Sequence, residues 1–226
     1  MIRRLFLPGL LDTGTVCGRL MAIRDGFVNL FVVSAPGGLV CFDAGFRQAR
    51  VARGFQSLGL NPRDVAAVFL THSHWDHAVG AGLFPNAEVF IGEHEPPSLS
   101  MKLKRLERPR PWKRVRDEQT VNAAGLSARV LHTPGHTAGS VSYLVENRFL
   151  FSGDAFRLRR GEAVPFLRCF SRDMPAMIRS IQKLASIEGI EWLLTGHSGA
   201  AGDPAKAFRR WRETATEPPR REAHGP

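Results

Sequence analysis

The sequence has little that would stabilise a small secreted scaffold or carry the chain through a membrane. Its 226 residues contain three cysteines, Cys17, Cys41 and Cys169, an odd number at wide spacing. A disulfide framework is therefore not expected, and a reducing compartment is the default. No stretch reaches the ~20 apolar residues of a transmembrane helix. The apolar start is cut at Pro8-Gly9, too early for a signal peptide. We expect a soluble, cytoplasmic protein.

Acidic residues are also scarce relative to basic ones, 21 against 31, which gives a formal charge of +10. Much of the excess is local, because eight basic residues and one acid, Glu107, lie between Lys102 and Arg116. Such a run can attract an anionic substrate or a nucleic acid. It is more commonly a solvated surface, so nucleic acid is not the expected partner, although the sequence leaves it open.

Linkers, repeats and low-complexity segments are absent too, so we expect one domain over residues 1–216. The polar tail 217–226 is expected to be disordered. Hydrophobic patterning predicts strands at 3–7, 15–23, 27–34, 39–42, 65–70, 87–91, 127–132, 141–145, 148–151 and 192–194. Helices are predicted at 48–58, 174–186 and 204–214, and partly over 93–107. Two β-rich halves, each ending in a helix, predict a two-sheet sandwich flanked by helices.

The most informative stretch is Thr71-His72-Ser73-His74-Trp75-Asp76-His77, which follows the buried strand predicted at 65–70. Four metal ligands lie within six residues: His72, His74, Asp76 and His77. Imidazole and carboxylate favour zinc, iron or manganese, and no thiolate is present to favour a soft structural site. A surface loop that is His-rich by accident rarely has this spacing. The stretch therefore predicts a metal site where a strand gives way to a loop.

Three more strand ends are followed by possible ligands. His136 follows the strand at 127–132, Asp154 follows the strand at 148–151, and His197 follows the strand at 192–194. Gly153 and Gly196 directly precede the last two, which leaves room for a sharp turn. Each signal is weak alone. Together with the first motif they predict one shared centre.

With these seven residues the chain resembles the metallo-β-lactamase superfamily over essentially its whole domain. The resemblance implies an α+β fold, an αββα sandwich of two mixed sheets flanked by helices, with a dinuclear metal site at one edge. It implies that His72, His74 and His136 hold one ion, that Asp76, His77 and His197 hold the other, and that Asp154 bridges them. Asp43 matches a family residue that supports a ligand imidazole from behind, although a turn-capping role is equally compatible with the sequence.

The ligand set implies two divalent ions, most commonly zinc, with iron or manganese as alternatives. Such ions acidify a water and polarise a substrate oxygen, so the expected reaction is hydrolysis. Asp76 can also orient this water or accept its proton. Trp75 either forms an aromatic wall of the site or packs against the core. Arg157, with its neighbours Arg159, Arg160 and Arg168, either binds an anionic group of the substrate or is solvated.

The expected substrate is a small ester, thioester, lactone or related anion. All seven ligands resemble glyoxalase II and the acyl-homoserine lactonases, whereas β-lactamases usually differ at the position of Asp154. Only 29 residues follow His197, fewer than the glutathione-binding segment of glyoxalase II needs. Arg157 stands where lactonases have a tyrosine. A mononuclear iron enzyme resembling persulfide dioxygenases, and a nucleic-acid-processing metallohydrolase, are the alternatives. The substrate, the metal and the oligomeric state stay open.

Overall fold

The computed structural model describes residues 9–96 and 112–216. The strand predicted at 3–7, most of the helix predicted over 93–107, most of the basic run and the tail 217–226 lie outside the described residues. Within them, no helix is long and apolar enough to cross a membrane.

Seven of the described strands form the first sheet, in the spatial order of the sequence. They are β1 (Gly14–Cys17), β2 (Leu20–Asp25), β3 (Val28–Ala35), β4 (Gly38–Phe42), β5 (Val65–Leu70), β6 (Glu88–Gly92) and β7 (Lys113–Val115). Strands β1 to β4 pair antiparallel, whereas β4 to β7 pair parallel. The carboxyl ends of β4, β5 and β6 therefore lie at the same edge of the sheet.

Six described strands form the second sheet in the order β15-β14-β11-β10-β9-β8. They are β8 (Thr120–Ala123), β9 (Leu126–His132), β10 (Val141–Val145), β11 (Phe149–Gly153), β14 (Trp192–Thr195) and β15 (Gly199–Ala201). Only β11 and β14 pair parallel among these strands. A separate hairpin joins β12 (Phe156–Arg159) to β13 (Glu162–Pro165).

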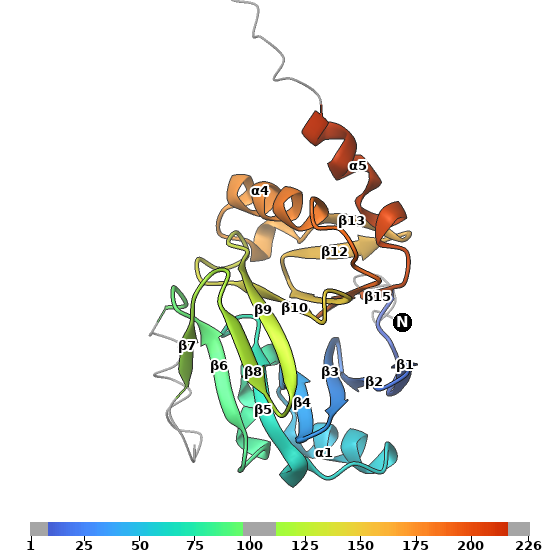
Figure 1. Ribbon diagram of the computed structural model, residues 1–226, viewed down its shortest axis with the longest axis vertical. Helices are drawn as coiled ribbons and strands as arrows, with labels where there is room; N and C mark the ends of the chain where they lie inside the picture. The colour runs from blue at the N-terminus through green and yellow to red at the C-terminus, as the bar shows by residue number, and fades with distance from the viewer. Residues whose placement is uncertain (1–8, 97–111, 217–226) are drawn as a thin grey trace, which may run out of the picture.

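Helices cover the two outer faces (Figure 1). Helix α1 (Gln48–Ser57) lies on the first sheet, and α4 (Met174–Ala185) and α5 (Pro204–Thr216) lie on the second. The four-residue α2 (Trp75–Ala78) follows β5, and short 3₁₀ turns span Pro62–Asp64, Val79–Leu83 and Arg168–Phe170. The predicted α+β sandwich of two mixed sheets flanked by helices is confirmed.

Three apolar clusters hold these layers together. The one between the sheets is rich in aromatic rings, and Phe42 of β4 stacks on Phe151 of β11 with 3.7 Å between the ring centroids. The other two lie under α1 and under α4 with α5. Helix α4 begins as predicted, because Asp173 accepts a hydrogen bond from the backbone N–H of Ala176 with Pro175 in the first turn.

The strand predictions failed where charge or a tight turn hides the pattern. The single strand expected at 15–23 is two strands, β1 and β2, because Gly18 adopts a positive φ of 50° and turns the chain. The sequence predicts no strand between Asp154 and Met174, where the β12–β13 hairpin lies. Phe156 and Leu158 are buried there, whereas the arginines between and after them are less buried, so the segment reads as a charged loop.

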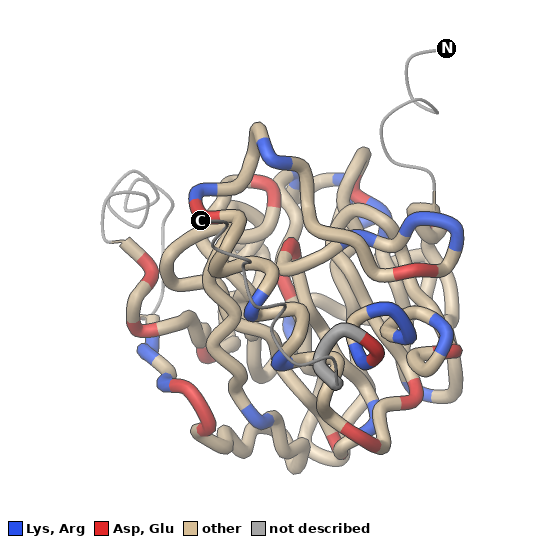
Figure 2. The backbone as a smooth tube through the Cα atoms, turned by 90° about the horizontal axis from the view of Figure 1, so that it is seen from above, with Lys and Arg blue, Asp and Glu red and all other residues tan. Residues whose placement is uncertain are grey.

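Basic and acidic residues are both spread along the backbone in the described part of the chain (Figure 2). The described end of the basic run has structural partners. Lys113 pairs with Glu88 at 2.6 Å, and Arg114 donates to the backbone carbonyls of Gly92 and Glu95.

Candidate metal centre

All seven predicted ligands meet at one edge of the sandwich. His72 and His74 follow β5, Asp76 and His77 lie in α2, and His136, Asp154 and His197 follow β9, β11 and β14. Three groups have ligand atoms within 4.8 Å of one another, and each can hold a metal ion: His72 with His74 and His136, His72 with His77 and Asp154, and Asp76 with His77 and His197. The second sheet thus completes a centre that the first sheet begins.

The first group is built from neutral imidazoles. Nε2 of His136 lies 2.8 Å from Nδ1 of His74, while the buried Nε2 of His72 has no hydrogen-bond partner among the described residues. Burial holds the pKa of His72 well below its ordinary value and lowers that of His136 to about 4. These rings therefore present unprotonated nitrogen atoms to the space between them.

In the second group, two ring nitrogens face each other although each ring keeps its proton on the opposite side. Nδ1 of His77 donates to Oδ2 of Asp43 at 2.8 Å, and Nδ1 of His197 donates to the carbonyl of Phe27 at 2.8 Å. A neutral imidazole has only one N–H. When both rings are neutral, each of the two Nε2 atoms, which lie 3.2 Å apart, therefore carries a lone pair and no proton. Such a pair needs a cation between or beside it.

Two carboxylates, those of Asp76 and Asp154, add negative charge to the second group, which favours a cation there. Oδ2 of Asp76 and Oδ2 of Asp154 each lie 3.3 Å from Nε2 of His197. Burial acts to lower the pKa of His77, but Asp43, Asp154 and Asp76 outweigh it and raise the pKa to about 9. Burial acts to raise the pKa of Asp154, yet the histidines around it keep that pKa well below its ordinary value. Imidazole and carboxylate oxygen in this arrangement fit divalent metal ions.

Asp43 combines the two roles that the sequence left open. Its Oδ2 holds His77, as described, while its Oδ1 accepts hydrogen bonds from the backbone N–H and the hydroxyl of Thr71 at 2.8 and 3.0 Å. The residue has a positive φ of 58° directly after β4, a conformation that Asp tolerates better than most residues. It therefore supports a possible ligand and closes the turn at the same time.

The two glycines before Asp154 and His197 are required by close contacts. A Cβ on Gly196 would lie 2.6 Å from Cε1 of His77 and 2.9 Å from Oδ1 of Asp154. A Cβ on Gly153 would lie 2.3 Å from Oγ1 of Thr71, and its φ is +52°. The glycines let the ligand loops of the two sheets approach each other.

Comparison with known proteins assigns this centre to a family. The model of the metallo-β-lactamase superfamily matches residues 23–213. The chain belongs to the metallo-β-lactamase superfamily. It is accordingly a hydrolase of that superfamily, and its candidate metal centre lies where two sheets meet at one edge.

Curated relatives support the same assignment. A protein of Glaesserella parasuis named hydroxyacylglutathione hydrolase is 34% identical over 142 residues, which is 61% of this chain and 52% of that protein. A protein of the same name from Xanthomonas campestris pv. campestris is 31% identical over 194 residues, 84% of this chain and 67% of that protein. The chain thus spans about half to two thirds of the length of these relatives.

Solved structures agree on the fold. A metallo-β-lactamase family protein from Thermus thermophilus superposes with a TM-score of 0.66 at 24% identity, covering 89% of this chain and 81% of that one.

Aromatic rings surround the centre of this superfamily member. Phe27 stacks on His197 with centroids 5.8 Å apart, and Phe166 lies 5.1 Å from His136 and 5.5 Å from His197. Trp75 is 51% exposed and meets Phe27 and Phe46 edge-on, at 5.7 and 4.7 Å between centroids. Trp75 is thus not a core residue, and it belongs to the aromatic group beside His197.

The sequence did not single out Phe27, Phe46 or Phe166. Nothing in the sequence separates them from the other phenylalanines, because their roles come from contacts between distant segments. Glu95, a buried carboxylate beside the first ligand group, was missed for the same reason.

Arg157 lies three positions after Asp154 in the chain, within β12. It lies on β12 opposite Val164, and its buried Nε has no hydrogen-bond partner among the described residues. Arg159, Arg160 and Arg168 are exposed. The anion-binding role of Arg157 therefore stays a prediction.

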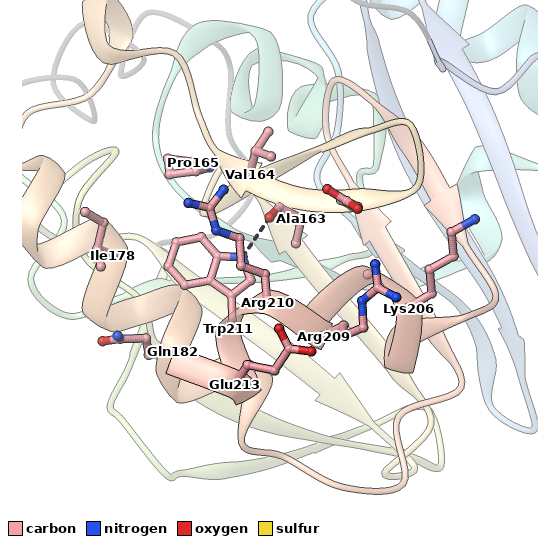
Figure 3. A pocket seen from close by; sticks show the side chains of 12 residues that line it. Ala163, Val164, Pro165, Ile178, Gln182, Lys206, Arg209, Arg210, Trp211 and Glu213 are labelled. Carbon is pink, nitrogen blue, oxygen red and sulfur yellow. Dashed lines mark hydrogen bonds between the residues drawn. The ribbon is translucent and has the colours of Figure 1, made fainter. Parts of the chain in front are cut away.

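A cleft of about 600 Å³ lies away from the ligands, between α4, α5 and β13 (Figure 3). Trp211 forms part of its lining and donates its indole N–H to the carbonyl of Ala163 at 2.7 Å. None of the proposed ligands lines this cleft. It has no part in the chemistry considered below.

Proposed function

We propose that the chain is a dinuclear metallohydrolase that uses two divalent ions, most commonly zinc, with iron or manganese as alternatives. His72, His74 and His136 hold one ion, and Asp76, His77 and His197 hold the other. The observation that carries the proposal is the position of Asp154. Its Oδ2 lies 3.3 Å from Nε2 of His136 in one group and 3.3 Å from Nε2 of His197 in the other. One carboxylate oxygen thus reaches both groups, as a bridging ligand must.

Two bound ions supply an acidified water and an electrophile for the substrate oxygen. The protein supplies orientation and a proton acceptor. Asp43 fixes the proton of His77 on Nδ1, which leaves Nε2 as the donor atom. Asp76 faces His197 and retains some exposure at its carboxylate, so it orients the attacking water and accepts its proton. A serine or cysteine nucleophile is not needed for such a reaction.

The substrate that we propose is a small ester, thioester, lactone or related anion. Thioesters are favoured by the two relatives named hydroxyacylglutathione hydrolase. The exposed edge of Trp75 beside Phe27 suits an apolar acyl or thiol portion of such a substrate. Arg157 is retained as the candidate partner for an anionic group. We also propose that residues 1–216 form one catalytic domain and that the protein is cytoplasmic.

Metal analysis combined with a substrate panel tests the proposal. Purified protein should contain about two ions per chain and hydrolyse at least one class among esters, thioesters, lactones and a β-lactam. His136→Ala and Asp154→Ala should each abolish hydrolysis and lower the metal content. His94→Ala is the matched control, because this exposed histidine lies outside the three ligand groups. About one iron per chain, with oxygen consumption and no hydrolysis, would replace the hydrolase by the redox alternative.

A further inference from the structure

Glu95 connects the two loops that carry the three histidines of the first group. It is 2% exposed and lies in the turn after β6. Its Oε1 accepts hydrogen bonds from the backbone N–H and the hydroxyl of Ser73 at 2.9 and 2.6 Å. Its Oε2 accepts one from the hydroxyl of Thr137 at 2.7 Å. Ser73 stands between His72 and His74, and Thr137 follows His136. A single carboxylate therefore spans both loops.

The backbone around Glu95 is packed so closely that this geometry has little freedom. A Cβ on Gly92 would lie 2.3 Å from the carbonyl oxygen of Gly139, and a Cβ on Gly139 would lie 2.0 Å from the backbone nitrogen of Glu95. Arg114 of β7 donates to the carbonyls of both Gly92 and Glu95. The turn that carries Glu95 is thus held from the strand beside it and from the loop of the opposite sheet.

Among the described residues, the hydrogen-bond partners of this carboxylate carry no charge. All three hydrogen-bond partners of Glu95 are neutral groups that can donate, and no basic side chain of the described residues forms an ion pair with it. Thr137 is held in turn by Ser140, whose hydroxyl lies 2.7 Å from that of Thr137. In a buried region of low effective dielectric, a negative charge acts over a longer range than in water. A cation held by the three histidines would be stabilised by this negative charge.

We propose that Glu95 is a positioning residue for the ion at His72, His74 and His136. Its carboxylate sets the separation of the loop that carries His74 from the loop that carries His136, and its charge favours a cation between them. The assignment rests on the proposed function, since it concerns the first of the two ions. Asp43 bonds the ring of His77 directly, whereas Glu95 acts through Ser73 and Thr137, which neighbour the three histidines in the chain.

The test compares Glu95→Gln in two backgrounds that each keep one ligand group. His197→Ala keeps the three-histidine group, and His136→Ala keeps the group of Asp76, His77 and His197. Titration with Co²⁺ alone, followed by its absorption spectrum, measures each dissociation constant without substrate. Glu95→Gln should weaken Co²⁺ about 10- to 100-fold in the His197→Ala background, the usual cost of losing such a partner. In the His136→Ala background the effect should be less than about 2-fold.

Glu93→Gln is the matched control, because it removes an exposed carboxylate two residues away and should change neither constant. Thr137→Val, which removes one of the three hydrogen bonds, should give a smaller loss in the His197→Ala background alone. Equal weakening of both groups by Glu95→Gln, or no weakening of either with only a lower melting temperature, would overturn the assignment. Hydrolysis by the wild-type chain is measured separately, so failure of the proposed reaction is not confused with failure of this assignment.

Discussion

Nδ1 of His77 lies 2.8 Å from Oδ2 of Asp43, and the other nitrogen of the same ring lies 3.2 Å from Nε2 of His197. The contact with Asp43 determines which atom of the His77 ring faces His197 without the proton that Asp43 holds. Because the carboxylate holds one ring proton on Nδ1, Nε2 is the atom that takes either a second proton or a metal ion. A residue at the end of β4 thus sets the protonation of a ligand in α2, which follows β5.

Replacing Asp43 by Asn should weaken the ion at the second group. Asn tolerates the positive φ at this position, so the turn is kept. The amide no longer fixes the tautomer of His77 by charge, and we expect metal affinity at this group to fall about 10- to 100-fold. Competition with a chromophoric chelator measures the change.

Asp25→Asn is the control for this variant. Asp25 is another buried carboxylate, the last residue of β2, and it accepts hydrogen bonds from the backbone N–H groups of Phe46 and Arg47. Its replacement should lower stability by about 1–3 kcal/mol and leave metal affinity unchanged. An equal loss of affinity in both variants would mean that general loosening, and not the His77 contact, is responsible.

Gly196→Ala should displace two ligands at once. The added Cβ would lie 2.6 Å from Cε1 of His77 and 2.9 Å from Oδ1 of Asp154, so one of these side chains must move. We expect lower metal content and a hydrolysis rate reduced at least about 100-fold, the usual cost of a misplacement near 1 Å. Gly14→Ala meets no atom within 4 Å and should behave as wild type. Wild-type metal content in Gly196→Ala would contradict this reading of the site.

The seven candidate ligands could be proposed from the sequence because each comes shortly after a buried strand, where the hydrophobic pattern is strong. Val65–Leu70 is apolar throughout, and His72, His74 and His77 come directly after it. The αββα arrangement followed from the same strands together with the resemblance. These features are local, so they can be read from neighbouring residues.

The features that escaped prediction depend on contacts between distant segments. Phe166 reaches His136 and His197 only after the β12–β13 hairpin has folded over the second sheet. Glu95 meets Thr137 across 42 positions of sequence. Neither residue type nor spacing marks these contacts. Arg157 stays a prediction, because its position after Asp154 does not by itself establish a substrate contact.

Protein stripped of metal should be most stable near pH 6.5. The pKa of His136 is lowered by burial to about 4, so below the ordinary value of 6.5 the unfolded state binds a proton that the folded state refuses. The pKa of His77 is raised to about 9, so its contribution is complete below 6.5 and is lost as the pH rises towards 9. The melting temperature in chelator should therefore rise from pH 4 to 6.5 and fall from 6.5 to 9.

Metal-loaded protein provides the comparison for this profile. A bound ion replaces the proton as the positive partner of His77, so the fall between pH 6.5 and 9 should vanish on loading. Thermal unfolding in matched buffers, with and without chelator, measures both curves. A flat curve above pH 6.5 in chelator would contradict the proton-binding role of His77 in the metal-free state.

Trp75→Ala should raise KM for substrates with a large apolar group and leave metal content unchanged. Trp75 is 51% exposed and rests edge-on against Phe27, which itself stacks on His197, so the ring offers an apolar surface next to the second group. Loss of about 1.4 kcal/mol of binding corresponds to a KM roughly 10-fold higher. An acetyl thioester, which is too small to reach the ring, should show little change.

Ile178→Ala removes another exposed apolar side chain, 39% exposed and beside the distant cleft, and should leave both substrates unaffected. Equal effects on the acetyl thioester and on a thioester with a large apolar group would show that Trp75 holds the loop between the ligands and does not select the substrate.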